Sequence, residues 1–272
     1  MAIAVERREL SRGTVLKRNL FSRERATQLF ILVIVLSVWQ YAGSRLGDFF
    51  LAPPTSVVSA FGEVLTNGQL WEALSTTLVG IVVGFFIAAV LGVVIGVLMG
   101  TSRAIAAGLN PLVSAGYVIP EAAIVPLLII WFGLGMEPRI IAVVLFAVFE
   151  IIVSTYAGVK NIDPILPEVA RSFGARSTQI FRKVIFMAAL PYIFAGLRMG
   201  AARAVKGMVV AELLFAATGV GGAIKEAANA YQTDKVMVFV IVITVLGVLF
   251  AGLVQFIERK SMRSWHEQYV ER

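Results

Sequence analysis

The sequence predicts an all-α membrane protein, a bundle of six spanning helices. Of its 272 residues, 58% are hydrophobic and 15% are charged, whereas about a quarter of the residues in a soluble domain are charged. The apolar residues form six continuous runs, near 26–43, 74–100, 112–132, 139–158, 188–217 and 236–257. Runs of about 18 or more apolar residues are long enough to cross the hydrocarbon layer as helices. Because the runs are continuous, they predict helices and not the alternating strands of a barrel.

The basic residues predict how the helices are oriented. If the N-terminus is inside, the cytoplasmic segments carry 17 Lys and Arg residues, whereas the outer loops carry four, Arg45, Arg139, Lys225 and Lys235. Cytoplasmic loops of membrane proteins carry such an excess, so both termini are expected in the cytoplasm. The same rule accounts for the net charge of +7 without a nucleic-acid partner. We therefore expect a multi-pass protein in a lipid bilayer.

The predicted organisation is one membrane domain between two tails. Residues 1–25 are polar and basic and are expected to form a cytoplasmic tail, as are residues 258–272. The membrane domain spans 26–257, and its first apolar run is longer than the core of a signal peptide, about 7–15 residues, which favours a retained helix. In the first outer loop, Pro53-Pro54-Thr55-Ser56 precede apolar residues at helical spacing, and Asn67-Gly68 follow them. These signals predict a short helix on the outer membrane face.

The second run carries small residues at every fourth position. They are Gly80, Gly84, Ala88, Gly92, Gly96 and Gly100. Such a stripe lets another helix approach closely. It predicts a packing face, either within the chain or across a dimer.

The third run contains Pro120 and Pro126. Each proline removes a backbone hydrogen bond and disfavours helical geometry at the preceding residue. A broken helix is tolerated at membrane depth only where it is buried in protein or lines a water-filled cavity. We therefore expect this span to line a pathway or an interface, and Gly133-Leu134-Gly135 to form the tight outer turn after it.

Ionisable residues within the apolar runs are the other candidates for the pathway. Such groups cost about 2.5–3.5 kcal/mol on insertion scales and tend to face the protein interior. The candidates are Glu121, Glu150, Glu212, Arg203 and Lys206, while Arg198 is close enough to the inner end of its run to reach the membrane surface. Two alternatives stay open for Glu121 and Glu150. They line the pore and favour a cationic or hydrogen-bond-donating solute, or they pair with Arg203 or Lys206 and are structural.

The segment 160–189 is too polar to span the membrane and too long for a turn. Pro164 and Pro167 precede Glu168, as is usual at a helix start, and Gly174 interrupts the helical pattern before Ser177 begins another. We expect two short amphipathic helices joined near Gly174. Their exposed apolar residues predict a docking site for another protein.

At this segment the sequence resembles a known family. Glu168-Val169-Ala170, with Gly174 after them, resembles the EAA motif of binding-protein-dependent ABC importers. The whole membrane region is similar to the permeases for taurine, aliphatic sulfonates and nitrate. The matching segments, in order, are Leu51-Ala52-Pro53-Pro54-Thr55, Pro126-Leu127 with Trp131-Phe132-Gly133-Leu134-Gly135, Tyr156-Ala157-Gly158-Val159, Leu190-Pro191, Gly196-Leu197-Arg198 and Ala211-Glu212-Leu213. The chain departs from the family at Phe186-Met187, Glu121 and Glu150, where relatives have Leu-Pro, a proline or small apolar residue, and a proline.

The resemblance implies a fold, partners, a mechanism and a location in a bacterial-type cytoplasmic (inner) membrane. The fold is that of a type I ABC importer permease with a cytoplasmic two-helix coupling loop at about 160–189. Two copies pair as a homodimer, two cytoplasmic ABC ATPase subunits bind ATP and Mg²⁺, and an extracytoplasmic solute-binding protein delivers a small solute such as a sulfonate or nitrate. The residues that the resemblance places at the ATPase contact are Glu168, Ala170, Arg171, Gly174, Ala175 and Phe181.

No enzymatic function is expected of the chain itself. It has no G-x-x-x-x-G-K-[ST] loop to cradle a nucleotide, and neither a catalytic triad nor a metal-ligand cluster is recognisable in the sequence. It has no cysteine, and its one histidine, His266, is in a polar tail. The alternatives are a proton-coupled secondary transporter that uses the buried glutamates and a membrane scaffold. The segment 160–189 counts against the first, and the broken third span against the second.

Overall fold

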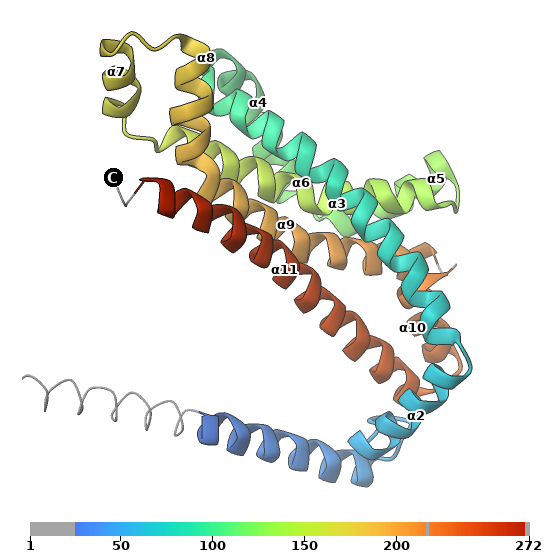
Figure 1. Ribbon diagram of the computed structural model, residues 1–272. Coiled ribbons are helices and arrows are strands. Elements are labelled where there is room, and N and C mark those ends of the chain that lie inside the picture. Colours follow the sequence, from blue (N-terminus) through green and yellow to red (C-terminus); the bar gives the residue numbers. More distant parts are fainter. Residues whose placement is uncertain (1–24, 216–217, 270–272) are drawn as a thin grey trace, which may run out of the picture.

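The computed structural model describes residues 25–215 and 218–269, and the side chains up to residue 262. This part of the chain is helical and contains no strand. Five helices are long and apolar enough to cross a membrane, and a sixth span is the bent pair of helices at 103–132. The predicted all-α bundle of up to six spans is therefore confirmed (Figure 1). Most of the two expected tails, with the side chain of His266, lies outside the described residues.

The helices follow one another with short connections. In chain order they are the first helix Arg25–Leu46, α2 Pro54–Thr66, α3 Gln69–Thr101, α4 Arg103–Val118, α5 Glu121–Phe132, α6 Met136–Lys160, α7 Ile165–Ser172, α8 Ser177–Ile180, a π-helical segment Phe181–Ile185, α9 Phe186–Phe215, α10 Gly219–Asn229 and α11 Thr233–Tyr269. The short helix expected after Pro53 is α2, which ends before Asn67 as predicted.

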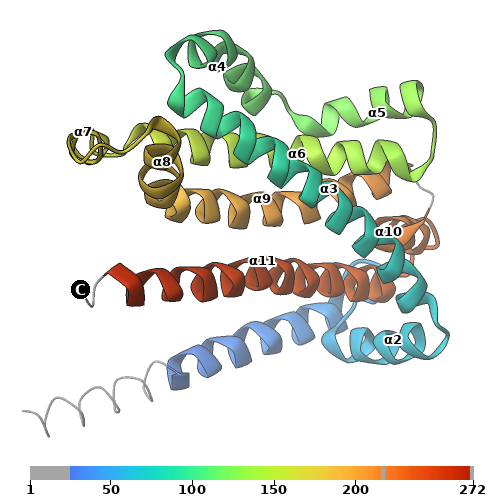
Figure 2. The ribbon, with the colours of Figure 1, turned by 45° about the horizontal axis from the view of Figure 1, so that its top comes forward.

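The bundle has two ends that differ in what they carry. In both views α7, α8 and the last turns of α11 lie at one end, and α2, α5 and α10 lie at the other (Figures 1 and 2). We call these the α7 end and the α2 end. The first helix begins on the side of the α7 end and runs to α2, and only 6% of its most apolar window is buried.

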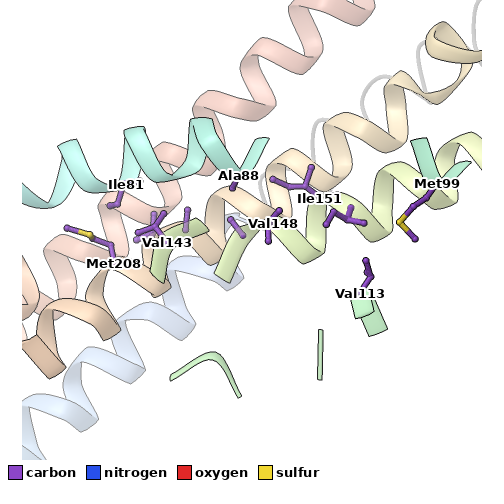
Figure 3. Close-up of a cluster of buried hydrophobic side chains, with 12 residues drawn as sticks. Ile81, Ala88, Met99, Val113, Val143, Val148, Ile151 and Met208 are labelled. Carbon is purple, nitrogen blue, oxygen red and sulfur yellow. The ribbon is translucent and has the colours of Figure 1, made fainter. Parts of the chain in front are cut away.

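The core lies where α6 packs between α3 and α9. Ile81, Val143, Ile151 and Met208, from these three helices, are almost fully buried in one cluster (Figure 3). The glycines of α3 make this approach possible. A Cβ atom on Gly92 would lie 2.7 Å from Cβ of Ile151, and one on Gly84 would lie 2.5 Å from Cγ1 of Val143. The small-residue stripe thus packs within the chain, mainly against α6.

The third span is broken at one proline and not at the other. Ile119 and Pro120 separate α4 from α5, and the two helices meet at 96°. Pro126 lies inside α5 without ending it, so the expected break there is wrong. Pro126 is the sixth residue of α5, so its missing N–H removes one intrahelical hydrogen bond and the helix continues to Phe132.

One other expectation needs correction. The second short helix expected after Gly174 is not separate, because α8 continues through the π-helical segment into α9, giving one span from Ser177 to Phe215. At the last span, the helix α11 continues into the expected tail, as far as Tyr269. In both places polar residues continue a helix beyond its apolar run, and polarity alone does not end a helix.

Candidate functional site

Three charged residues from three helices meet in the middle of the bundle. Arg203 of α9 lies between two carboxylates, with Nη2 2.8 Å from Oε1 of Glu150 on α6 and Nη1 3.3 Å from Oε1 of Glu121 on α5. Tyr117, at the end of α4, lies 3.5 Å from the same oxygen of Glu150. We call Arg203, Glu121 and Glu150 the charged triad. Of the two alternatives for these glutamates, the structure contains the pairing with Arg203.

Glu150 and Arg203 lie far from both ends of their helices, whereas Glu121 is the first residue of α5. Glu150 is ten residues before the end of α6 at Lys160, about 15 Å at the helical rise. Glu121 follows the break at Pro120 and occupies the first turn of α5, where a carboxylate faces the positive end of a helix dipole. The side chains are not sealed from the surroundings, since 38% of Arg203 and 21% of Glu121 are exposed. The break therefore places an acidic group at membrane depth with an open side.

Lys206 lies one turn beyond Arg203 on α9. Residues three apart on a helix are neighbours on its surface, yet Lys206 makes no ion pair within the described part of the chain and is exposed. It borders a groove of about 610 Å³ between α9 and α11. The other lining residues are mostly apolar: Phe146, Ala202, Val205, Val209, Val210, Ile243, Thr244, Gly247, Val248 and Ala251. Lys206 is thus a cation at the rim of an apolar groove, and no carboxylate of the described residues forms an ion pair with it.

Glu212 does not join this group. It is fully buried and accepts hydrogen bonds from Thr77 Oγ1 at 2.7 Å and from the backbone N–H of Gly221 at 2.8 Å. Thr77 Oγ1 in turn accepts the N–H of Val220 at 2.9 Å. Glu212 and Thr77 together cap the N-terminus of α10. The expectation that Glu212 lines the pathway is corrected in this structure, because its side chain has no exposed surface.

Arg139 is another cation whose environment differs from the expected outer loop. Its side chain is buried at the α2 end, where Nη1 donates to Thr218 Oγ1 at 2.7 Å and Nη2 donates to the carbonyl of Leu134 at 3.4 Å. The guanidinium also lies 5.9 Å from the ring centre of Phe215. Arg139 therefore ties the turn after α5 to the start of α10.

The α7–α8 segment projects from the α7 end (Figure 1), and the apolar side chains of α7 are exposed. Every residue of α7 has solvent-accessible surface, and the exposed fractions reach 59% at Ile165 and 87% at Phe173 just after it. Gly174 ends α7 with φ +76°. The N–H of Ala175 bonds to the carbonyl of Ala170 at 3.0 Å, and that of Gly174 to Arg171 at 2.8 Å. This is a Schellman motif, which requires a left-handed residue at Gly174.

The other residues expected at the ATPase contact lie on the same segment. Glu168 and Arg171 are exposed on α7, and Phe181 is half-buried at the start of the π-helical segment. In the described residues there is no group of three or more His, Asp and Glu side chains that could hold a metal ion. The structure thus contains an exposed apolar surface on α7 and a group of charged side chains where α5, α6 and α9 meet.

Sequence reasoning missed several residues of these sites. Thr77, Thr218 and Gly219 position α10 but belong to no motif. The helix α10 itself was missed because its first turn is rich in glycine, which is a poor helix former. Its cap comes from Thr77, 143 residues away from Val220 in the chain. A local sequence signal for such a cap does not exist.

Comparisons with known proteins agree on one family. The family model described as binding-protein-dependent transport system inner membrane component matches residues 88–263. The chain is 37% identical to the putative aliphatic sulfonates transport permease protein SsuC of Escherichia coli (strain K12), over 90% of this chain and 94% of that protein. It is 29% identical to the taurine transport system permease protein TauC of the same organism, over 90% of this chain and 91% of that one.

A solved structure shares the fold. The crystal structure of an amino acid ABC transporter with histidines contains a chain that superimposes with a TM-score of 0.60 at 18% identity. The match covers 73% of this chain and 97% of that one. At this identity the likeness concerns the fold alone.

Proposed function

The chain belongs to the family of binding-protein-dependent transport system inner membrane components, and from that premise we propose that it forms the translocation pathway of an ATP-driven importer for a small organic solute. It acts with a second permease copy, two cytoplasmic ABC ATPase subunits that bind ATP and Mg²⁺, and an extracytoplasmic solute-binding protein. The solutes named for its relatives, aliphatic sulfonates and taurine, support small organic sulfonates or similar compounds as its solute class.

The observation that carries this proposal is the exposed apolar surface of α7. Phe173 is 87% exposed, and Ile165, Leu166 and Val169 are between 47% and 59% exposed. A helix of eight residues cannot cross a membrane, so these side chains need a protein partner to remove them from water. A cytoplasmic ATPase subunit is that partner if the α7 end faces the cytoplasm, as the basic residues indicate.

The continuity of α8 with α9 supplies the coupling. From Ser177 to Phe215 the backbone is one helical rod, and this rod carries both Arg203 and Lys206. Movement of an ATPase subunit against α7 and α8 is therefore transmitted along α9 to the charged triad without an intervening loop. The π-helical turn at Phe181–Ile185 is the one place where the rod departs from α-helical geometry, and π-helical turns are frequent at functional sites.

The charged triad also bears on the alternative of a proton-coupled secondary transporter. A proton relay needs carboxylates that take up and release protons in turn. Here Arg203 lies 3.3 Å from Glu121 and 2.8 Å from Glu150, so one guanidinium occupies both carboxylates. This arrangement favours the importer over a proton-coupled carrier.

The proposal is tested by replacing the residue that ends α7. Gly174→Pro removes an N–H of the Schellman motif and cannot adopt positive φ, so the docking surface is reoriented while the membrane spans are untouched. We expect normal insertion, at least a tenfold loss of ATP-dependent uptake and reduced co-purification of the ATPase. The matched control is Gly47→Pro, which affects a glycine of similar φ, +82°, in the first loop at the α2 end.

Gly47→Pro is expected to leave ATPase co-purification at the level of the unchanged chain. If Gly174→Pro retains both uptake and the ATPase, α7 is not the coupling surface. If the unchanged chain binds no ATPase at all, the proposed function itself is wrong.

A further inference from the structure

We infer that the exposed face of α9, together with the charged triad, is a solute-contact face for a zwitterionic or similarly dipolar solute, one that carries an anionic group and an ammonium or N–H donor. The inference rests on the proposed function and narrows its solute class. It assigns the anionic group to Lys206 and the ammonium or donor group to Glu121 and Glu150.

The two cations lie on one exposed stripe of α9. Successive residues of an α-helix are about 100° apart, and at this spacing one face of α9 collects the residues that are not buried. They include Met199, Ala202, Arg203, Lys206, Val210 and Leu213. The opposite face, with Gly200, Ala204, Gly207 and Ala211, is buried. Arg203 and Lys206 thus point to the same open side of the bundle, about 4.5 Å apart along the helix axis.

This open side is hydrated or faces a polar occupant. Charged groups at membrane depth face a protein interior or a water-filled cavity, because their insertion into lipid is costly. Val118 and Ile119, which lie beside the break between α4 and α5, are exposed, and non-helical backbone at membrane depth is tolerated only where it lines a cavity or is buried in protein. The charged side chains and the broken backbone lead independently to the same face.

The charges on this face are divided between two places. The triad contains two carboxylates and one guanidinium, so its net charge is −1 when all three are ionised, and Arg203 is already neutralised by its partners. Lys206 adds +1 without a counter-charge in the described residues. A simple anion drawn to Lys206 therefore meets a negative triad one turn away, and a simple cation drawn to the triad meets Lys206. A solute with both charges satisfies both places.

The groove beside Lys206 fits the uncharged part of such a solute. Its lining is apolar except for Lys206 and Thr244, and small-solute sites combine an apolar surface with a few polar groups. A lipid chain in the groove would leave the ammonium of Lys206 without an anion. A small organic anion supplies that partner and covers the apolar wall as well.

The absence of cysteine from the chain allows a direct measurement of this face. In the assembled, membrane-reconstituted complex with a cysteine-free ATPase and receptor, Ala202→Cys provides a single thiol on the stripe. Its reaction rates are measured with anionic 2-sulfonatoethyl and cationic 2-trimethylammonioethyl methanethiosulfonate. Phe86→Cys is the matched control, because Phe86 is 68% exposed on α3 among other exposed apolar side chains. We expect the thiol at 202 to react with both reagents and the thiol at 86 with neither.

The ratio of the cationic to the anionic rate reports the local potential. Relative to Ala202→Cys alone, Glu121→Gln is expected to lower this ratio about sevenfold and Lys206→Met to raise it about sevenfold. One charge at about 7 Å in a hydrated site changes each rate about threefold, in opposite directions for the two reagents. An unreactive thiol at 202, or a ratio that neither substitution changes, overturns the inference. These outcomes do not depend on the identity of the solute or on ATPase binding, so they are separate from a failure of the proposed function.

A second measurement compares two solutes that differ by one ammonium group, taurine and ethanesulfonate. With the receptor held the same, the ratio of their ATP-driven uptake rates is measured for the unchanged chain and for Glu121→Gln, so that any change in the ratio comes from the permease. We expect Glu121→Gln to lower the taurine-to-ethanesulfonate ratio at least threefold. Uptake of both solutes with an unchanged ratio contradicts the inference. Where the complex carries neither solute, the thiol measurement alone decides.

Discussion

Glu212 and the pair Glu121–Glu150 are carboxylates within the membrane spans that differ in burial and in their bonding partners. Glu212 is fully buried and is satisfied by a hydroxyl and a backbone N–H. Glu121 and Glu150 are satisfied by one guanidinium, and part of the group is exposed. Hydrogen bonds from fixed backbone groups hold a carboxylate in one place, whereas a partly exposed ion pair leaves room for exchange with water or a ligand. On the inference above, the difference separates a structural carboxylate from carboxylates that contact the solute.

The largest effect is expected from removal of the buried carboxylate. Glu212→Ala leaves the hydroxyl of Thr77 and the N–H of Gly221 without their acceptor, and each buried unsatisfied group costs about 1–3 kcal/mol. We expect a loss of about 2–6 kcal/mol, seen as a large fall in the thermal midpoint and yield of the detergent-purified complex. Glu226→Ala, which removes an exposed carboxylate on α10, is the control and is expected to change the midpoint little. A normal midpoint for Glu212→Ala would remove the distinction between the two sites.

A smaller effect is expected when only the bridging hydroxyl is removed. Thr77→Val keeps the shape of the side chain but leaves the N–H of Val220 without an acceptor and Glu212 with one donor fewer. A cost of about 1–3 kcal/mol follows. Thr76→Val is the matched control, since Thr76 is exposed and its hydroxyl donates only to the carbonyl of Glu72 within its own helix. Equal midpoints for the two variants would contradict the capping role of Thr77.

The next effect concerns the space around Glu212. Gly219 has φ +82°, and a Cβ on it would collide with the carboxylate of Glu212. Gly219→Ala is expected to cost about 1–3 kcal/mol, the usual range for a strained backbone residue, and to raise the hydrogen-exchange rate of the first turn of α10. Gly252→Ala, in a helix where a Cβ meets nothing within 4 Å, serves as the control. Unchanged exchange in α10 would show that the site can adapt.

The smallest effect on stability is expected at the triad. Glu121→Gln removes one charge from a partly exposed pair, and such pairs contribute about 0–1 kcal/mol. The thermal midpoint is therefore expected to stay within a few degrees of that of the unchanged chain, while uptake kinetics change. This pattern is the reverse of that expected for Glu212→Ala. A midpoint as low as that of Glu212→Ala would make Glu121 structural as well.

The fold was predictable because its signals are local and repeated. Apolar run length predicted the spans, Pro120 predicted the break, and Asn67-Gly68 predicted the end of α2. The sites were predictable only in part, because they depend on how helices are rotated against one another. The positions of Glu121 and Glu150 within the apolar runs predicted that they need a partner. That the partner is Arg203 and not Lys206 follows from helix packing. The cap that Thr77 and Glu212 form on α10 joins three helices, and nothing in the local sequence predicts it.

The stripe of α3 also determines the register of the bundle. Gly84, Gly92, Gly96 and Gly100 face Val143, Ile151, Thr155 and Val159 in turn, a constant separation of 59 positions. A seam that repeats every four residues has other alignments of similar shape, displaced by about 6 Å. The same separation pairs Ala88 with Ala147, both fully buried. A displacement by one repeat in either direction brings the methyl group of Ala88 against Val143 or Ile151. Neither side chain leaves room for a methyl group, because a Cβ on the glycine that now faces it would lie only 2.5–2.7 Å away. One alanine in a row of glycines thus excludes the two neighbouring alignments, and so fixes the height at which α6 presents Glu150.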